Sequence, residues 1–321
     1  MKISVIMACY NGERYIEYQL DSLLMQTHKV DECIIVDDCS GDSTTQIIEA
    51  YIKKNKLMSW KLIRNKDNCG YIESFRKALS LAKGEIIFLA DQDDVWEKKK
   101  VEIMCQIMSN HNDILSLCSS FYSINQFGEQ IPTRSPIFTE NHGLIILRKM
   151  QKEKVYKITL KEIISRNIAM GCTMAIRREL VSLYLRKGPN EIPHDWEINF
   201  WAATRNGLFY LNSELTLHRI HGNNTSEMKV DPYLSRGYRI QEYKKYIKYF
   251  NEYKRMIQEL LPMEKKVVVR FKELSDYYAL RIKALENRSP MIIVEVIMKF
   301  WRKLGIEALL SVVDIPSMIK K

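Results

Sequence analysis

The chain has 321 residues and a net charge of +10, with 46% hydrophobic and 27% charged residues, a composition ordinary for a globular protein with one large domain and an appendage. Its seven cysteines are scattered without zinc-type pairs or a disulfide framework, and no stretch reaches the ~20 apolar residues that span a bilayer. These features exclude a disulfide-stapled domain and a membrane-spanning protein. Since the N-terminus also lacks the pattern of a signal peptide, we expect a cytoplasmic protein.

The first half of the chain alternates short β-rich runs with helical patterns, which predicts βαβ units. The expected strands are residues 3–8, 33–36, 60–64 and 85–90, and the expected helices are residues 13–27, 44–55 and 70–83. The predicted fold class is therefore α/β, with a Rossmann-like, mostly parallel sheet.

The second half is less regular. Residues 116–123 and 172–176 have strand character, residues 128–143 resemble a loop, residues 196–206 a helix, and residues 208–211 and 215–218 two short strands. From Tyr233 onward the pattern is helical, and residues 230–321 hold 19 lysines and arginines against 11 aspartates and glutamates, a net charge of +8. We place the boundary near Lys229, between a domain of residues 1–228 and a basic helical C-terminal extension of residues 229–321.

Polar side chains follow three of the expected parallel strands, at Tyr10-Asn11, Asp37-Asp38 and the run from Asp91 to Asp94. The carboxyl ends of parallel strands meet at one edge of a sheet, where such folds bind ligands, so these segments predict a shared nucleotide pocket. The sequence has neither a G-x-G-x-x-G fingerprint nor a P-loop, so another group must neutralise a bound diphosphate.

The acids of Asp91-Gln92-Asp93 are suited to a divalent cation, because Mg²⁺ and Mn²⁺ commonly bridge protein carboxylates and substrate phosphates. The alternative is that these acids solvate a turn and cap the following helix, a role expected of Asp94, which stands just before Glu97. The strongly apolar strand before the run favours the cation, because three acids at the sheet edge repel one another without one.

Six motifs appear together, in order and spacing, as in the inverting family-2 glycosyltransferases of the GT-A fold, which the chain resembles over roughly its first 225 residues. They are residues 4–12 (SVIMACYNG), 34–40 (IIVDDCS), 68–70 (NCG), 91–94 (DQDD), 171–178 (GCTMAIRR) and 194–196 (HDW). The segment DQDDVW (91–96) most resembles the rhamnosyltransferase-like members that build bacterial surface polysaccharides. The resemblance implies transfer of a sugar, rhamnose or another hexose, from a nucleoside-diphosphate sugar.

The resemblance also implies the roles of individual residues. Asp38 would read the base, Asp91 would contact the ribose, and Arg219 would contact the diphosphate. Asp93 and His221 would hold Mn²⁺ or Mg²⁺, with His218 as an alternative ligand. The full set of implied nucleotide-sugar-binding residues is Ala8, Tyr10, Asn11, Asp38, Asn68, Gly70, Asp91, Gln92 and Arg219.

Asp195 is the implied catalytic base. An ionised aspartate can take the proton of the acceptor hydroxyl as that oxygen attacks the anomeric carbon, and a single displacement inverts the configuration. Many relatives have Glu before this Asp, whereas this chain has His194. The structural alternative is that Asp195 caps the helix expected at residues 196–206.

Processive synthases of the family carry a Q-x-x-R-W signature and transmembrane helices, and this chain has neither, so we expect transfer of single sugars to a glycan or lipid-linked acceptor. In the tail, basic residues interleave with aromatic ones between Arg239 and Arg255. That pattern suits an anionic membrane surface at the inner face of the plasma membrane, or ordinary helix packing. No nucleic-acid module is recognisable, and the oligomeric state stays open.

Two other functions compete with sugar transfer. A sugar nucleotidyltransferase also needs an α/β nucleotide pocket and acidic metal ligands, but its glycine-rich loop is missing here. A non-catalytic scaffold could dock on membranes through the basic tail. The retained acids Asp91, Asp93 and Asp195 argue against a decayed site.

Overall fold

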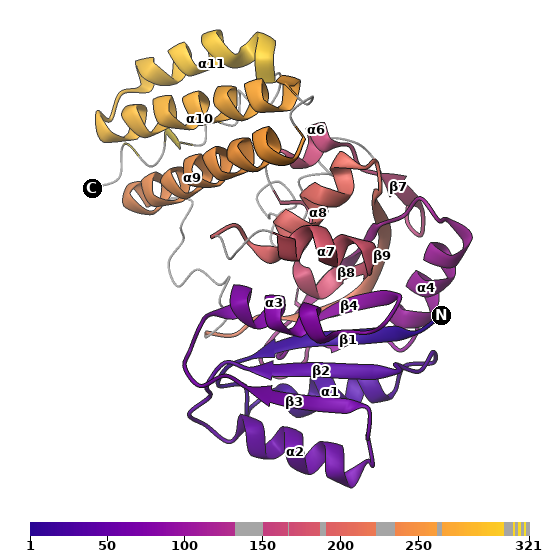
Figure 1. The fold of residues 1–321 in the computed structure, drawn as a ribbon. Coiled ribbons are helices and arrows are strands. Elements are labelled where there is room, and N and C mark those ends of the chain that lie inside the picture. Colours follow the sequence, from indigo (N-terminus) through magenta and orange to yellow (C-terminus); the bar gives the residue numbers. More distant parts are fainter. Residues whose placement is uncertain are drawn as a thin grey trace. The chain divides into compact units, whose positions relative to one another are not determined.

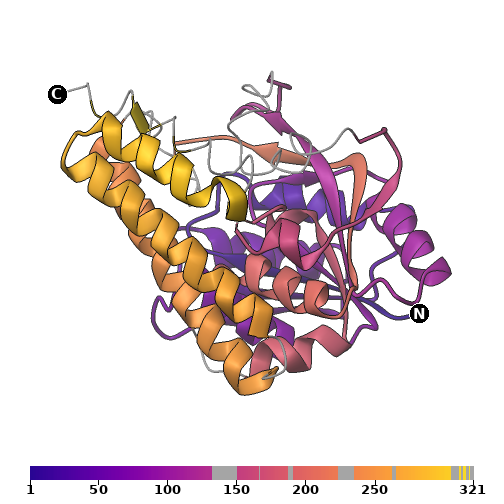
Figure 2. The ribbon, with the colours of Figure 1, turned by 90° about the horizontal axis from the view of Figure 1, so that it is seen from above.

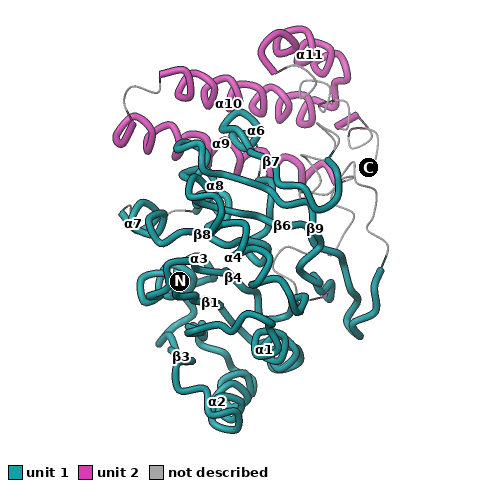
Figure 3. The backbone as a smooth tube through the Cα atoms, turned by 90° about the vertical axis from the view of Figure 1, so that its right-hand side faces the viewer, with its two compact units in different colours: residues 1–221 teal, residues 222–321 magenta. Residues whose placement is uncertain are grey.

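The structure is a computed structural model that describes residues 1–131, 150–165, 167–186, 191–222, 235–261 and 265–304, with residues 311, 314, 315 and 318. The chain forms two compact units, residues 1–221 and 222–321, which are coloured separately in Figure 3. The boundary predicted between residues 228 and 229 lies outside the described residues.

The first four strands of unit 1 are parallel, as the sequence predicts (Figure 1). They are β1 (Ile3–Cys9), β2 (Glu32–Asp37), β3 (Trp60–Arg64) and β4 (Ile86–Asp91), in the spatial order β3-β2-β1-β4. The chain therefore leaves β1 toward β2 and β3 and then returns to β4 on the other side of β1. This reversal makes the carboxyl ends of β1 and β4 the topological switch point, where open α/β sheets form their ligand crevice.

Helices cover both faces of this parallel half. Helices α1 (Ile16–Leu24), α2 (Thr44–Lys54) and α4 (Lys100–Asn110) share one core with β1, β2 and β4. Helix α3 (Tyr71–Leu81) connects β3 back to β4 and packs on the opposite face against β1 and β2 (Figures 1 and 3). Right-handed crossovers require this arrangement, because the direction of strand addition reverses after β3.

The second half of the sheet is mixed. Beyond β4 the order continues β8 (Met174–Arg177), β6 (Ser116–Ile124), β9 (Leu208–Arg219) and β5 (Val95–Trp96), while β7 (Val155–Lys157) also pairs with β9. The two short strands predicted at 208–211 and 215–218 are in fact one strand, β9, whose register against β6 shifts at β-bulges. Among the described residues, the remaining helices of unit 1 are α6 (Leu160–Ile163), the 3₁₀ turn η2 (Gly171–Thr173), α7 (Glu179–Arg186) and α8 (His194–Thr204).

The described part of unit 2 includes the helices α9 (Arg236–Leu260), α10 (Lys265–Glu286) and α11 (Pro290–Leu304), with α10 between the other two (Figures 1 and 2). In α9 the side chains of Tyr243, Phe250 and Tyr253 are buried. Three of the aromatic residues of the predicted basic and aromatic surface therefore pack inside the helical unit. Among the described residues, no helix has both the length and the hydropathy to cross a membrane.

A buried ion cluster ties the residues after α11 to the rest of unit 2. The carboxylate of Asp314 accepts hydrogen bonds from Tyr243 Oη (2.6 Å), Arg281 Nε (2.7 Å) and Arg239 Nη1 (3.2 Å). The Arg281 guanidinium also lies 4.3 Å from the centre of the Tyr243 ring. Because buried charges are costly unless paired, this cluster fixes the register between the segment at Asp314 and helices α9 and α10.

Candidate functional site

Gln92 joins the carboxyl ends of β1 and β4. Its Oε1 accepts from the backbone N–H of Tyr10 (2.9 Å), and its Nε2 donates to the Tyr10 carbonyl (3.0 Å). A Cβ on Gly12 would lie 2.2 Å from Gln92 Oε1, so only glycine allows this close approach. The predicted residue Gln92 therefore sets the conformation of the loop after β1 and positions the exposed Tyr10.

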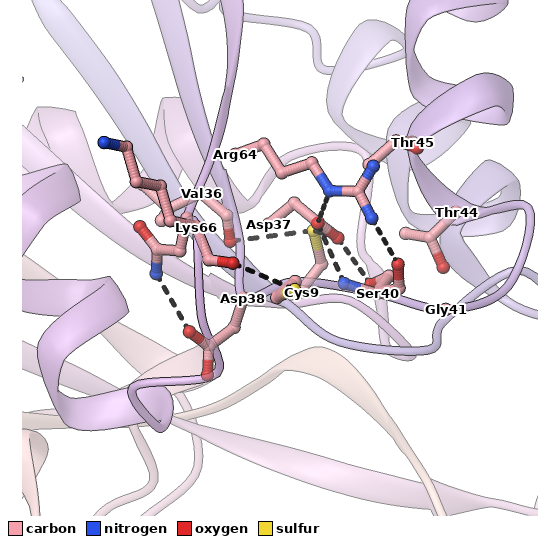
Figure 4. A network of polar contacts seen from close by, with 12 residues as sticks. Cys9, Val36, Asp37, Asp38, Ser40, Gly41, Thr44, Thr45, Arg64 and Lys66 are labelled. Carbon is pink, nitrogen blue, oxygen red and sulfur yellow. Dashed lines mark hydrogen bonds and ion pairs between the residues drawn. The ribbon is translucent and has the colours of Figure 1, made fainter.

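The loop after β2 is organised around the buried carboxylate of Asp37, as Figure 4 shows. Asp37 accepts from the Ser40 backbone N–H (3.0 Å) and pairs with Arg64 Nε (3.5 Å). Asn11, whose φ of 48° lies in the left-handed region, accepts from the Gly41 N–H (2.9 Å). These contacts fix the loops after β1 and β2 against each other.

Asp38 holds the loop that precedes α3. Its carboxylate accepts from the backbone N–H groups of Cys69 (2.9 Å) and Gly70 (2.7 Å) and from Asn65 Nδ2 (2.9 Å). Gly70 has a φ of 84°, which a residue with a side chain adopts only with strain, while Asn68 is exposed on the same loop. The base-reading role of Asp38 stays a prediction, and three protein donors already engage its carboxylate.

The acidic run begins at the last residue of β4. Asp91 lies opposite Ala8 in the register of β1 and β4, so both predicted residues face the switch point. Burial, together with the charges of Asp94 and Asp93, raises the pKa of Asp91 to about 8. Without a cation, the folded protein therefore retains a proton on this carboxyl at neutral pH.

The end of β9 brings histidines to this acidic run, which lies more than a hundred residues earlier in the sequence. His221 Nε2 is 2.9 Å from Asp93 Oδ2, and the His221 ring packs 4.7 Å from the ring of Tyr15. The structure thus places the two predicted metal ligands, Asp93 and His221, side by side.

Asp94 corrects one sequence prediction. It does not cap a following helix, because α4 begins only at Lys100 and the Asp94 side chain is fully buried. Its carboxylate accepts from His218 Nδ1 (3.0 Å) and from the backbone N–H of Arg219 (3.0 Å). Burial alone would raise the pKa of Asp94, but the His218 charge and these hydrogen bonds lower it, while Asp94 raises that of His218 to about 9.

Arg219 is buried at the same place. Its Nε donates to the Asp93 carbonyl (2.8 Å), its Nη1 donates to the Asn125 carbonyl (3.2 Å), and its guanidinium lies 4.9 Å from the Tyr15 ring centre. The predicted contact of Arg219 with a diphosphate stays a prediction. In the structure Arg219 fixes the backbone of the acidic run.

The buried Lys100 lies next to the cluster and was not predicted from the sequence. Lys100 Nζ donates to Thr216 Oγ1 (2.8 Å) and to the Cys172 carbonyl, and burial lowers its pKa to about 7. A signal was available, since Lys100 lies four and eight residues before the buried Met104 and Met108, on the apolar face of α4.

Two sets of donor atoms can be tested against a divalent cation. Asp93 Oδ2 and His221 Nε2 are 2.9 Å apart, close to the roughly 3 Å between adjacent ligands at ~2.1 Å from an octahedral metal. Among the described residues, Asp94, Cys172 and His218 also gather within 4.8 Å. Burial and the charge of Asp94 raise the pKa of the Cys172 thiol, however, so that buried set must lose protons first. The Asp93 and His221 pair, beside the crowded Asp91, fits a cation better.

Asp195 lies in the first turn of α8, where Pro193 occupies the N-cap position. Its carboxylate accepts from the Gly171 N–H (3.1 Å) and from the N–H of the next residue, Trp196 (2.7 Å). Asp195 is therefore not the N-cap residue, although it satisfies one free N–H of the first turn. Its charge also contributes to the raised pKa of Asp91, which places it near the acidic run.

His194 is buried beside the predicted base. Its ring stacks on Phe75 at 4.0 Å, neither ring nitrogen has a hydrogen-bond partner in the described part of the chain, and burial lowers its pKa. A Cβ on Gly171 would lie 2.7 Å from His194 Nε2. His194 is thus a neutral packing residue that helps to hold Gly171 against Asp195.

Comparison with known proteins identifies the family of this arrangement. Residues 4–184, more than half of the chain, match the model of Glycosyl transferase family 2. The poly(ribitol-phosphate) beta-N-acetylglucosaminyltransferase TarS of Staphylococcus aureus is 37% identical over 118 residues, which are 36% of this chain and 20% of that protein. The chain spans less than two thirds of the first curated relatives that it matches, with 41%, 57% and 35% of their lengths.

Solved structures share the fold. The structure of S. aureus TarS 1–349 in complex with UDP-GlcNAc has a TM-score of 0.58 and 21% identity, covering 99% of this chain and 90% of that one. The mannosyltransferase PcManGT of Pyrobaculum calidifontis, in complex with GDP-Man and Mn²⁺, has a TM-score of 0.54 and 15% identity, covering 99% and 88%. The α/β, GT-A-like architecture predicted from the sequence is confirmed.

Proposed function

Because the chain belongs to glycosyl transferase family 2, we propose that it transfers a single sugar from a nucleoside-diphosphate sugar to a hydroxyl of a glycan or lipid-linked acceptor. The acceptor would belong to a growing cell-surface polymer. One observation carries this proposal: the ligand edge of β1 and β4 gathers Asp91 and Asp93 with His221 from the end of β9. Family membership alone would not require these groups to meet.

The donor would bind at the switch point. The loops after β1 and β2 form one side of it, with Tyr10, Asn11 and the Asp38-bound segment around Gly70, and Asp91 would meet the ribose from the end of β4. An Mn²⁺ or Mg²⁺ ion at Asp93 and His221 would neutralise charge on the diphosphate. The geometry of that pair and the raised pKa of Asp91 support this assignment.

Asp195 would act as the base. Two backbone N–H groups orient its carboxylate, which leaves lone pairs to accept the proton of the acceptor hydroxyl. The hydroxyl oxygen would form the new glycosidic bond while the bond to the nucleoside diphosphate breaks, so the anomeric configuration inverts. General-base assistance of this kind is worth ~10² to 10⁴ in rate.

The donor sugar is part of the proposal. The resemblance of residues 91–96 favours rhamnose or another hexose, whereas the named relative TarS is a beta-N-acetylglucosaminyltransferase. A panel of dTDP-rhamnose, UDP-GlcNAc and GDP-mannose, each with and without Mn²⁺, tests both the class and the sugar. Release of a nucleoside diphosphate with one of the donors is the expected result.

Other products would refute the proposal. Pyrophosphate exchange would indicate the nucleotidyltransferase alternative, and the absence of any turnover or nucleotide binding would indicate the scaffold. Release of the nucleoside diphosphate that persists without Mn²⁺ and without Mg²⁺ would retain the transferase class but refute the metal role of Asp93 and His221. Treatment with a chelator followed by readdition of Mn²⁺ distinguishes metal-dependent release from metal-independent release.

We also propose that the enzyme is cytoplasmic and peripheral at the membrane, because residues 230–321 carry a net charge of +8 and a lipid-linked acceptor would lie at an anionic surface. Co-sedimentation with phosphatidylglycerol vesicles at two salt concentrations tests it. Binding that weakens at high salt is expected, and equal recovery in the supernatant with and without vesicles would refute it.

A further inference from the structure

Helix α11 has two apolar faces. One face packs inside unit 2 through the buried side chains Ile293, Val296, Phe300 and Leu304. The other face is exposed and carries Met291, Val294, Met298 and Trp301, with exposed fractions of 82%, 61%, 76% and 50%. These four residues follow one another at intervals of three and four, so they form one stripe along the helix, named here the α11 stripe.

The stability of unit 2 does not explain why the α11 stripe is apolar, because these side chains are exposed. Scattered exposed apolar residues are normal, but an aligned set of large apolar side chains on a helix that already has a buried face marks a surface that contacts something else. The helix has 15 residues and is therefore ~22 Å long, too short to span the ~30 Å core of a bilayer. It has the length of a helix that lies along a surface.

Positive charge borders the stripe at the C-terminal end. Lys299 and Arg302 are exposed beside Met298 and Trp301, while Lys303 Nζ pairs with Glu273 (3.2 Å) on α10. Glu295 is the only acid within α11. An apolar stripe beside lysine and arginine is the pattern of an interfacial helix, whose side chains enter the headgroup region while its cations meet anionic lipids.

We propose that the α11 stripe, with Lys299 and Arg302, is the surface through which this protein docks on an anionic lipid bilayer. A second copy of the chain fits less well, because a twofold contact with the two helices parallel would bring Lys299 and Arg302 of both copies together. A single 15-residue helix face is also small beside the ~1,200–2,000 Å² that stable protein interfaces bury.

The inference deepens the proposed function, on which it rests for its purpose, since it names the surface that would bring the enzyme to a lipid-linked acceptor. It also changes the surface that the sequence indicated. The tyrosines of α9 that interleave with basic residues are buried or half-buried, so the exposed apolar side chains for a membrane come from α11 instead.

Trp301 is a built-in reporter of this contact. The other four tryptophans, Trp60, Trp96, Trp196 and Trp201, are all buried. Addition of vesicles of phosphatidylcholine with ~30% phosphatidylglycerol should shift the emission of Trp301 to the blue, and brominated lipids should quench it. The Trp301→Phe variant should bind the vesicles but lose both signals.

Two variants test the two components of the surface. Met298→Asp places a charge in the middle of the α11 stripe and should weaken vesicle binding about tenfold or more. The double variant Lys299→Gln/Arg302→Gln should weaken binding roughly tenfold at low salt and remove much of its salt dependence. Met58→Asp is the matched control, because Met58 is 91% exposed in unit 1 and should leave binding unchanged.

Each outcome decides the proposal. Vesicle binding by Met298→Asp equal to wild type, or Trp301 emission unchanged by bound vesicles, overturns it. A concentration-dependent dimer in wild type that is lost in Met298→Asp, without vesicle binding, assigns the stripe to a second copy instead. Because vesicle binding is measured without any sugar donor, a wild type that binds vesicles but releases no nucleoside diphosphate would refute the proposed function and not the docking surface.

Discussion

Replacing Asp91 by Asn should stabilise the metal-free protein at alkaline pH, although it removes a residue of the proposed donor site. Burial and the charges of Asp94 and Asp93 raise the pKa of Asp91 from 3.8 to about 8. The folded protein therefore holds a proton that the unfolded chain releases above pH ~4. The free energy of unfolding falls as the pH rises through this window and levels off above pH ~8.

The structure gives the size of the effect. A window of about four pH units at ~1.4 kcal/mol per unit corresponds to a loss on the order of 5 kcal/mol at pH 8.5, and to about 1–2 kcal/mol at pH 5. Asn resembles the protonated carboxyl in shape and has no charge to lose. Since 1 kcal/mol shifts Tm by roughly 2–4 °C in a domain of this size, Asp91→Asn should raise Tm at pH 8.5 by about 5 °C or more.

Thermal unfolding by circular dichroism at pH 5 and pH 8.5, each with a chelator or with Mn²⁺, measures the effect. The gain from Asp91→Asn should be smaller at pH 5 and should shrink with Mn²⁺, because a bound cation relieves the repulsion among the acids. Asp113→Asn, at an exposed aspartate of unit 1, should not change Tm in any condition. An Asp91→Asn protein that melts at or below the wild-type temperature at pH 8.5 without metal would refute the reasoning.

Asp195→Asn should lower sugar transfer by ~10² or more while donor affinity, measured by calorimetry, stays near wild type; near-normal transfer would place the base elsewhere. Gly12→Ala should displace Gln92, whose Oε1 lies 2.2 Å from the new methyl position, and weaken donor binding with little change in Tm; unchanged donor affinity would contradict this. Asp314→Ala leaves Arg281 and Arg239 buried without their carboxylate and should cost about 3–5 kcal/mol in urea unfolding, whereas a loss under 1 kcal/mol would show that the cluster is dispensable.

The parallel half of the sheet was predictable because three of its strands, β1, β2 and β4, are buried on both faces. Such strands form continuous apolar runs, as in residues 86–90, and the turn residues between them mark the helix starts. The position of the acidic run then follows from topology, since every parallel strand ends at the same edge. The first half of the site therefore required only local patterns and one general rule.

The second half of the site depends on a contact that local patterns do not contain. His221 reaches Asp93 because β9 pairs with β6 and with β5, which directly follows the acidic run. The sequence shows apolar alternation in residues 208–218 but not which strand they join. Only the family resemblance indicated that His221 belongs to the site. The β-bulges between β6 and β9 interrupt the alternation of residues 208–218, so the sequence predicted two short strands where the structure has one.

The buried roles of Asp94 and Lys100 were not predicted from the sequence, for a different reason. A charged residue after a strand is usually a solvated turn residue, so the cap was the reasonable expectation for Asp94. The tertiary structure overrides it by supplying His218 and the Arg219 N–H as partners. For Lys100 the helical spacing did point inward, but a propensity argument assigns lysine to the surface unless a partner is known.

The residues of the acidic run thus fall into two groups: Asp94 supports the structure, and Asp91 and Asp93 face the proposed ligand. This difference bears on the proposed metal site. Asp94 is held ionised by His218, and Arg219 binds the carbonyl of Asp93, so the backbone of the run is fixed without any ligand. Burial and the neighbouring acids raise the pKa of Asp91 to about 8, so Asp91 keeps a proton at neutral pH until a cation offsets the negative charge of the run. The geometry of such a site is set before any ligand binds, and a cationic ligand would offset the negative charge of its crowded acids. The proposed divalent cation with a diphosphate would meet both conditions.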